Sequence, residues 1–330
     1  MTPLLSIQHL TVELSARDRT FDAVSDLSFT VARGEVLALV GESGSGKSMT
    51  ALAIMRLLPE PVARISKGRI LFDELDLAAA SEASLRSIRG NRIGLIFQEP
   101  MTSLNPSMRV GPQVAEALRL HKGLDAAAAR RRVEEIFEQV RIPDPKRRFD
   151  DYPHQMSGGM RQRVVIALAL ACDPDVLIAD EPTTALDVTT QAQILETFRD
   201  LQAAVGAATI LITHDLAVVA ETADRVAVMY AGRIVEETTT ERLFAAPQHP
   251  YTHGLLGSIP HIAEAGSATE RGRLAEIPGT VPALWALPRG CAFAPRCPRA
   301  RQRCEVERPP LSDMAPGHRA ACWYPMKGAA

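Results

Sequence analysis

A glycine-rich run near the N-terminal end has the residue types and spacing of a phosphate-binding loop. It reads Gly41-Glu42-Ser43-Gly44-Ser45-Gly46-Lys47-Ser48 and fits the pattern G-x-x-x-x-G-K-[ST]. Glycines let backbone amides wrap around phosphates, and the positive end of a following helix adds to the attraction for negative charge. In such loops the lysine reaches the terminal phosphates and the next residue ligates Mg²⁺. The candidate contacts to a nucleoside triphosphate and its Mg²⁺ are Gly41, Ser43, Gly44, Gly46, Lys47, Ser48 and Met49.

Two acids at the end of an apolar run supply a second part of the same chemistry. The run Val176–Ala179 leads directly into Asp180 and Glu181. A strand of this kind places carboxylates at the carboxyl edge of a sheet, beside a phosphate loop. Asp180 is a candidate Mg²⁺ ligand and Glu181 a candidate for orienting the attacking water. A pair of surface acids at a strand end is the alternative, and it weakens because both motifs occur in one chain.

These side chains need strands whose ends meet at one edge of a sheet. The continuous apolar run 35–40 precedes the glycine-rich loop, and a helical pattern from Met49 to Leu58 follows it. This order is typical of strands buried on both faces of a mainly parallel sheet. Further candidates for buried strands are Ile93–Phe97, Val176–Ala179 and Thr209–Thr213.

Two other segments flank this α/β core. Apolar and polar residues tend to alternate between Leu5 and Val31, which predicts antiparallel strands with one solvated face. Helical periodicity in Val114–Leu120 and Ala126–Val140 predicts an inserted helical subdomain of about residues 99–170. After Phe244 the composition shifts to Pro, Gly and Arg, so we predict a boundary between residues 1–245 and a C-terminal extension, 246–330.

Four further motifs, taken with the two above, resemble the ABC ATPase family. Ser157-Gly158-Gly159-Met160-Arg161-Gln162-Arg163 resembles the family signature, although Met156 and Met160 stand where Leu and Gln are frequent. Gln98 resembles the Q-loop glutamine, Ala185-Leu186-Asp187 the D-loop, and His214 the switch histidine. A lone histidine at a strand end is usually structural, but here all motifs follow the family's order.

The resemblance implies a fold and a mechanism. The fold is an α/β phosphate-loop ATPase with a RecA-like mixed-sheet core, an N-terminal antiparallel β subdomain and an inserted helical signature subdomain. Two such domains pair head to tail, and ATP lies between the phosphate loop of one and Ser157, Gly158 and Gly159 of the other. The implied Mg²⁺ ligands are Ser48, Gln98 and Asp180. The implied catalytic residues are Glu181, His214 and Lys47, with Asp187 as a further site residue.

Phe21 is the best candidate for stacking on the adenine ring. It precedes the phosphate loop by a distance typical of the family's aromatic loop. The alternative is a core phenylalanine on a strand.

The C-terminal extension resembles that of dipeptide and oligopeptide importer ATPases, a group that includes nickel importers. The similarity rests on His249-Pro250-Tyr251-Thr252, on the cysteine-bearing tail and on Tyr152-Pro153-His154-Gln155 before the signature. It implies an ATP-hydrolysing motor of a peptide importer, with a nickel or other solute importer as the alternative within the group. The implied partners are a second ATPase subunit, usually a paralogue, two transmembrane permeases and, through the complex, an extracytoplasmic solute-binding protein.

Four cysteines are clustered in the extension. Cys291, Cys297, Cys304 and Cys322 follow C-x5-C-x6-C-x17-C and can hold an iron–sulfur cluster or a zinc ion, or remain unligated thiols. The spacing lacks the C-x2-C pairs usual for zinc, and similar tails bind [4Fe–4S], so the cluster is favoured. The isolated Cys172 is expected to pack in the core. For the arginines of the tail, a solvated basic face is the default interpretation. The functional alternative is that they offset the negative charge of a cluster and its thiolates.

Composition limits the location and the partners. The 330 residues carry a formal net charge of −2, which gives no sequence-independent attraction for nucleic acid or anionic lipid. The most apolar stretch, Val164–Cys172, is shorter than the about 20 residues that a transmembrane helix needs. The N-terminus lacks the features of a secretory signal. We therefore expect a protein at the cytoplasmic face of the membrane, held there by permeases.

Two rival classes remain. Non-transport ABC ATPases of DNA repair or translation generally carry a second nucleotide domain, a long coiled coil or a zinc-finger insertion, and the sequence shows none of these. A regulatory module that only changes shape with nucleotide would not need Glu181 and His214.

Overall fold

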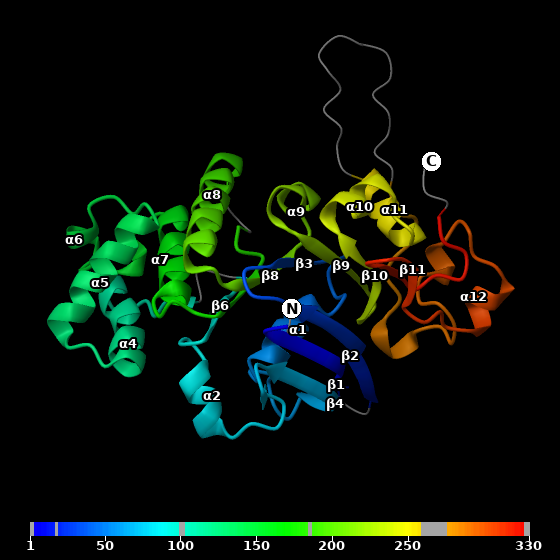
Figure 1. The fold of residues 1–330 in the computed structure, drawn as a ribbon, viewed down its shortest axis with the longest axis horizontal. Coiled ribbons are helices and arrows are strands. Elements are labelled where there is room, and N and C mark those ends of the chain that lie inside the picture. The colour runs from blue at the N-terminus through cyan, green and yellow to red at the C-terminus, as the bar shows by residue number, and fades with distance from the viewer. Residues whose placement is uncertain (1–2, 17–18, 99–102, 184–186, 259–275, 327–330) are drawn as a thin grey trace, which may run out of the picture.

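A mixed β-sheet runs through the centre of the protein (Figure 1). The computed structural model describes residues 3–16, 19–98, 103–183, 187–258 and 276–326. Within them, eight strands follow the order β11-β12-β10-β9-β3-β8-β7-β6. The strands are β3 (Val36–Val40), β6 (Ile93–Ile96), β7 (Val176–Asp180), β8 (Ala208–Thr213), β9 (Arg225–Tyr230), β10 (Arg233–Thr239), β11 (Ser312–Ala315) and β12 (His318–Ala320). The pairs from β9 to β6 are parallel, whereas the pairs involving β10, β11 and β12 are antiparallel.

A second, antiparallel sheet contains strands from both sides of the phosphate loop in the sequence. Its order is β2-β1-β4-β5. The strands are β1 (Leu5–Ala16), β2 (Arg19–Val31), β4 (Ala63–Phe72) and β5 (Leu75–Asp76). The predicted antiparallel strands between Leu5 and Val31 are therefore confirmed.

Strand β3 shows why the central strands are mostly apolar. All five of its residues are buried. Leu37 and Leu39 pack in a core with β1, β2 and α1 (Lys47–Ile54), whereas Ala38 and Val40 pack on the other side with α9 (Leu216–Thr222). Because successive side chains of a strand point to opposite faces, helices or strands on both sides require a continuous apolar run.

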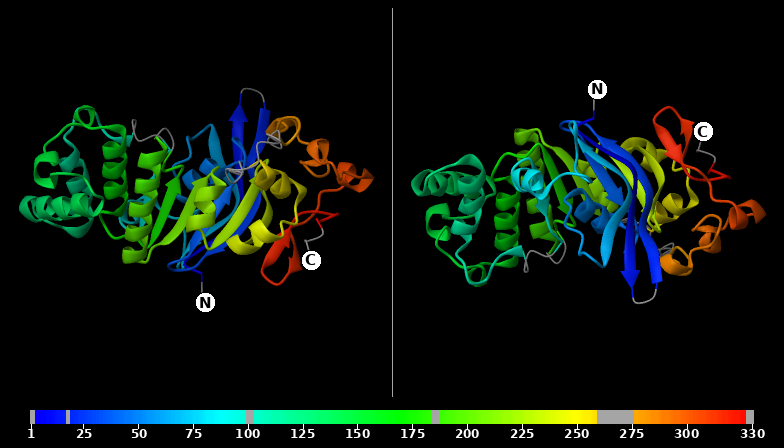
Figure 2. Two further views of the ribbon diagram at one scale, coloured as in Figure 1. Left: turned by 90° about the horizontal axis from the view of Figure 1, so that it is seen from above. Right: turned by 90° about the horizontal axis from the view of Figure 1, so that it is seen from below.

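Helices α4 to α7 form one end of the molecule (Figures 1 and 2). They are α4 (Val110–Lys122), α5 (Ala126–Gln139), α6 (Pro145–Arg148) and α7 (Gly158–Leu170), and the 3₁₀ turn η1 (Pro153–Gln155) precedes α7. In α5 the buried residues Ala129, Val133, Ile136 and Phe137 recur at helical spacing, and Asp125 caps the helix by accepting the N–H of Ala128 at 2.7 Å. The periodicity of the sequence thus gave the correct element type.

The remaining helices complete the layers around the sheets. They are α2 (Glu82–Ile88), α8 (Val188–Val205), α10 (Thr240–Ala245), α11 (Pro250–Gly257) and α12 (Gln302–Val306), with the short 3₁₀ turns η2 (Leu284–Ala286) and η3 (Ala294–Arg296). No helix in the described ranges is long and apolar enough to span a membrane.

The C-terminal segment lies at the end opposite to α4–α7 and is built into the core (Figures 1 and 2). Strand β12 pairs with β10, with Ala320 opposite Glu236. Tyr251 and Phe293 share a buried cluster with Val40 of β3. The boundary after residue 245 stays a prediction, since the segment that follows it shares a sheet and a core with the residues before it.

Candidate functional site

The glycine-rich loop lies between β3 and α1, as its sequence predicts. Gly44 and Gly46 adopt the positive φ angles 78° and 103°. A Cβ atom at Gly46 would lie 2.8 Å from the backbone oxygen of Ala23, so a side chain there meets rigid backbone. Gly46 also caps α1, which starts at Lys47, and the first turn of the helix therefore faces the loop.

Lys47 is buried and held by the loop itself. Its Nζ donates to the carbonyl oxygens of Gly41 at 2.7 Å and Glu42 at 3.1 Å, and to the hydroxyl of Ser45 at 3.4 Å. Burial lowers the pKa of Lys47, and the nearby carboxylates, Glu181 first among them, oppose this effect. An ammonium group in this position can exchange its carbonyl acceptors for phosphate oxygens without moving far.

Asp180 ends β7 with an unsatisfied oxygen. The side chain is buried, and its Oδ1 has no hydrogen-bond partner in the described part of the chain. Burial raises the pKa of Asp180, while a hydrogen bond with Ser48 lowers it. A buried carboxylate oxygen without a partner is costly unless a cation or a donor satisfies it. The pair of Asp180 and Ser48 therefore fits the oxygen ligands that Mg²⁺ prefers.

Three further predicted residues converge beside this pair. Glu181 receives a hydrogen bond from Nε2 of Gln98 at 3.1 Å on Oε2, and Nδ1 of His214 lies 3.2 Å from its Oε1. Glu181 has φ of 47°, an uncommon value for a residue other than glycine, and such backbone outliers cluster at functional sites. The sequence reasoning thus located Gln98, Glu181 and His214 at one place.

Sheet register explains the convergence. In β3 and β8, Val40 lies opposite Thr213, and in β7 and β8, Asp180 lies opposite Ile212. Loops that leave parallel strands at the same level meet at the carboxyl edge of the sheet. The ends of β3, β6, β7 and β8 therefore bring the loop, the glutamine, the acids and the histidine together.

The signature begins a separate helix. Ser157 caps α7, and its Oγ accepts the N–H of Met160 at 3.3 Å. A Cβ at Gly159 would lie 2.7 Å from Cγ2 of Thr190 in α8, so the absence of a side chain allows α7 and α8 to approach. Across the described residues, no hydrogen bond joins Ser157 to the phosphate loop.

The D-loop residue Asp187 caps α8. Its carboxylate accepts the N–H of Thr190 at 2.9 Å and the hydroxyl of Thr190 at 2.7 Å. The hydrogen bond from the Thr190 side chain lowers the pKa of Asp187. Ala185 and Leu186, the rest of the predicted D-loop, lie outside the described residues.

Phe21 lies on β2, partly buried, at a pocket next to the loop. Its ring centroid is 5.7 Å from that of Trp285 in η2, at an interplanar angle of 64°. The pocket is lined by Thr20, Phe21, Asp22, Ser25, Ala231, Arg233, Leu284, Trp285, Leu287, Ala292 and Arg308. The ring is thus at a pocket wall, and its role in adenine binding stays a prediction.

The C-terminal segment contacts the phosphate loop through residues that sequence reasoning did not identify. Arg296 donates from Nη1 to Oε2 of Glu42 at 2.8 Å and from Nη2 to Oε1 at 3.1 Å. The hydroxyl of Tyr251 accepts the backbone N–H of Glu42 at 2.9 Å. Tyr251 belongs to the quoted His-Pro-Tyr-Thr motif, but no sequence signal pairs Arg296 with Glu42. Arg296 is buried, so the expected solvated basic face does not include it.

The four clustered cysteines line one pocket together with His249 and Trp323. None forms a disulfide. Burial raises the pKa of the Cys291 and Cys297 thiols, and it raises that of Cys322 to about 11. Across the described residues, no group of three or more His, Cys, Asp or Glu side chains is arranged to hold a metal ion. Cys172 is fully buried among apolar residues, as predicted.

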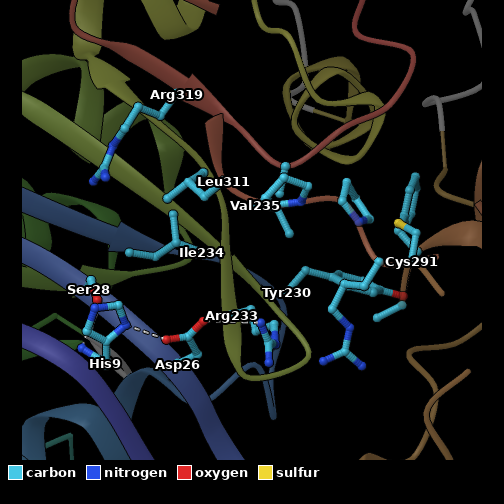
Figure 3. A pocket seen from close by; sticks show the side chains of 16 residues that line it. His9, Asp26, Ser28, Tyr230, Arg233, Ile234, Val235, Cys291, Leu311 and Arg319 are labelled. Atoms are coloured by element: carbon cyan, nitrogen blue, oxygen red, sulfur yellow. Dashed lines mark hydrogen bonds and ion pairs between the residues drawn. The ribbon is translucent and has the colours of Figure 1, made fainter. Parts of the chain in front are cut away.

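A larger cavity lies between β2, β10 and the C-terminal segment (Figure 3). Its volume is about 310 Å³, and the ion pair of His9 and Asp26, at 2.7 Å, forms part of one wall. Cys291 and Leu311 also line this cavity (Figure 3). No residue of the phosphate loop lines this cavity.

The fold and this arrangement of motifs define a phosphate-loop ATPase of the ABC type. The ABC transporter family profile matches residues 24–184, and the profile of the oligopeptide/dipeptide transporter C-terminal region matches residues 235–304. The chain is 51% identical to the dipeptide transport ATP-binding protein DppD of Bacillus subtilis over 98% of this chain and 95% of the relative. It is 48% identical to DppD of Escherichia coli over 99% and 98% of the two chains.

Solved structures agree with this assignment. One of them is the dimeric ATP-binding cassette MJ0796 in a post-hydrolysis state, bound to ADP and Pi. Its TM-score to this chain is 0.64 at 26% sequence identity, and the similarity covers 72% of this chain and 98% of that chain. The chain belongs to the ATP-binding subunits of ABC transporters, in the oligopeptide and dipeptide transporter family, and it is an ATPase.

Proposed function

We propose that this chain is the motor subunit of an importer that couples ATP hydrolysis to the uptake of dipeptides or oligopeptides. The observation that carries the proposal is the convergence of Lys47, Asp180, Glu181 and His214 at one sheet edge. The chain also matches nearly the whole length of relatives that are named dipeptide transport ATP-binding proteins. A nickel or other solute importer of the same group is the alternative, because permeases and a solute-binding protein select the solute.

The residues divide the chemistry among them. The loop amides and Lys47 hold the phosphates, with Gly41, Ser43, Gly44, Gly46 and Met49 as loop contacts. Ser48, Asp180 and Gln98 would hold Mg²⁺, and the ion would neutralise charge on the phosphates. Glu181 orients the attacking water, and His214 stabilises charge on the γ-phosphate. The contact between His214 and Glu181 keeps both groups at the place where the water must be.

The proposed site is completed by a second subunit. Ser157, Gly158 and Gly159 start a helix whose N–H groups suit a γ-phosphate, yet no hydrogen bond joins Ser157 to this chain's own loop in the described residues. A head-to-tail pair, with Asp187 at the seam, brings the partner's signature to the loop. The partner is a paralogous ATPase, and two permeases hold the pair at the cytoplasmic face of the membrane.

We further propose that Cys291, Cys297, Cys304 and Cys322 hold a [4Fe–4S] cluster. All four line one pocket, and none is oxidised to a disulfide. Each thiolate of such a cluster binds a different iron, so its ligands lie farther apart than those of one zinc ion. The cluster would supply local negative charge and a link between segments of the extension.

The test is transport by the complete complex with its permeases and binding protein, reconstituted in vesicles. We expect peptide-stimulated ATP hydrolysis, and Glu181→Gln should reduce turnover by about 10² or more while ATP binding is retained. Glu135→Gln, which changes an exposed acid of α5, is the control. Unchanged turnover of the Glu181 variant would remove this residue from the mechanism, and transport of nickel without peptides would replace the proposed solute.

Iron and sulfide analysis of anaerobically purified protein tests the cluster, and zinc or no metal would overturn it.

A further inference from the structure

Two aromatic side chains from distant parts of the chain face one pocket beside the phosphate loop. Phe21 comes from β2 and Trp285 from η2, which packs against β2. Their ring centroids are 5.7 Å apart at an angle of 64°. Trp285 is 59% exposed, which is unusual for the largest apolar side chain. An exposed tryptophan at a pocket mouth is available to a ligand.

The pocket is connected to the loop by backbone contacts. The N–H of Gly232 donates to the carbonyl oxygen of Ser45 at 3.0 Å, and the N–H of Ser25 donates to the carbonyl oxygen of Gly232 at 2.8 Å. Ser25 also lines the pocket. Phe21 precedes Ala23, the backbone neighbour of Gly46, by two residues, a span of about 7 Å along a strand. A nucleotide whose phosphates occupy the loop therefore has its base within reach of both rings.

The second tryptophan of the chain differs from Trp285 in its surroundings. Nε1 of Trp323 donates to the carbonyl oxygen of Glu307 at 3.0 Å, and the guanidinium of Arg303 lies 3.4 Å from the centroid of the Trp323 ring. Trp323 thus has partners in the C-terminal segment itself. Trp285 has its aromatic partner on β2, in the nucleotide-binding part of the chain.

We propose that Trp285 forms a second aromatic wall of the nucleotide-base site, next to Phe21 and in edge contact with it. The C-terminal segment then contributes directly to ATP recognition, and the site favours bases with a large π surface over phosphate alone. This inference rests on the proposed function, because it takes the phosphate loop as the place where triphosphate binds.

Tryptophan fluorescence of the full-length chain tests the proposal. Trp323→Phe leaves Trp285 as the only one of the two tryptophans. ATP in the presence of a Mg²⁺ chelator, which prevents hydrolysis, should change the emission of Trp285 in a saturable manner. Inorganic tripolyphosphate, which fills the phosphate site without a base, should not. The reciprocal variant, Trp285→Phe, should lose the ATP-dependent signal.

Binding measured by equilibrium dialysis separates this inference from the proposed function. Trp285→Ala should weaken ATP binding by about tenfold, as expected for the loss of one stacking partner, with the affinity for tripolyphosphate unchanged. Trp285→Phe should retain most of the ATP affinity. If ATP binds with equal affinity to wild type and Trp285→Ala and the emission stays constant, the second wall is refuted while the ATPase assignment stands. If neither ATP nor tripolyphosphate binds, the proposed function falls and this inference with it.

Discussion

Arg296→Met tests whether the C-terminal segment holds the phosphate loop in place. The guanidinium makes two hydrogen bonds to the carboxylate of Glu42, and its Nε donates to the carbonyl oxygen of Pro278 at 2.9 Å. A planar fork of this kind matches a carboxylate in a way that a lysine cannot. The substitution removes the charge and the fork and retains a long apolar side chain.

The magnitude follows from the burial of the two partners. Removing one member of a buried ion pair costs about 3–5 kcal/mol, because the other charge is left without a partner. The Arg296 side chain is 6% exposed but that of Glu42 is 28% exposed, so water reaches the carboxylate once the arginine is gone. We therefore expect a smaller loss in the free energy of unfolding, about 2 kcal/mol.

A double-mutant cycle in chemical denaturation measures the pair. The variants are Arg296→Met, Glu42→Gln and the double substitution, and we expect a coupling energy of about 2 kcal/mol. Arg199→Met is the control, since the side chains of its ion pair with Glu221 are 40% and 64% exposed and the pair is worth less than about 1 kcal/mol. ATP affinity should fall in both single variants because Glu42 lies in the loop. Additive effects, within about 0.5 kcal/mol, would show that the contact does not fasten the loop.

Three shorter predictions concern other residues. Gly46→Ala should abolish ATP binding in a dialysis assay, because the added Cβ would meet the backbone oxygen of Ala23. The control, Gly123→Ala, should bind ATP normally, since nothing lies within 4 Å of a Cβ at that position. Asp180→Asn should abolish Mg²⁺-dependent hydrolysis and yet raise the free energy of unfolding measured without Mg²⁺, since burial raises the pKa of Asp180 and disfavours its charge. A less stable variant would contradict this. Burial lowers the pKa of His249 from 6.5 to about 4. Between these pH values the unfolded chain binds a proton at His249 that the folded chain does not. The free energy of unfolding should therefore fall by about 3 kcal/mol as pH decreases through this range. His249→Asn should remove this part of the slope in denaturation at pH 5 and pH 7.5, and an unchanged slope would assign it to other groups.

Local patterns were sufficient to predict which motifs follow the strand ends at the carboxyl edge of the sheet. Runs such as Val176–Asp180 carry their own signal, because a strand buried on both faces must be apolar along its whole length. The loop and the acids follow such runs directly, so their position at strand ends is fixed by sequence neighbours. Helix α5 is predicted for a similar reason, since its buried residues repeat at helical spacing.

The contacts of the C-terminal segment have no such local signal. Arg296 and Glu42 are 254 positions apart, and an arginine among other arginines gives no indication of its partner. Strands β11 and β12 have four and three residues, too short for a clear alternation, and they exist because β10 offers a free edge. Trp285 lies in a short 3₁₀ turn, whose place beside β2 depends on the packing of the whole segment. Tertiary context decided each of these positions.

These contacts make the C-terminal segment a structural part of the ATP site rather than an appendage. Tyr251 contacts the backbone of Glu42, Arg296 contacts its side chain, and Arg296 is followed directly by Cys297 of the four-cysteine pocket. A change in that pocket that displaces Cys297 must therefore move the residue bonded to the loop. Because the phosphates require the loop in one conformation, occupancy of the cysteine pocket and ATP affinity should be thermodynamically coupled, and each should change the other by the same factor.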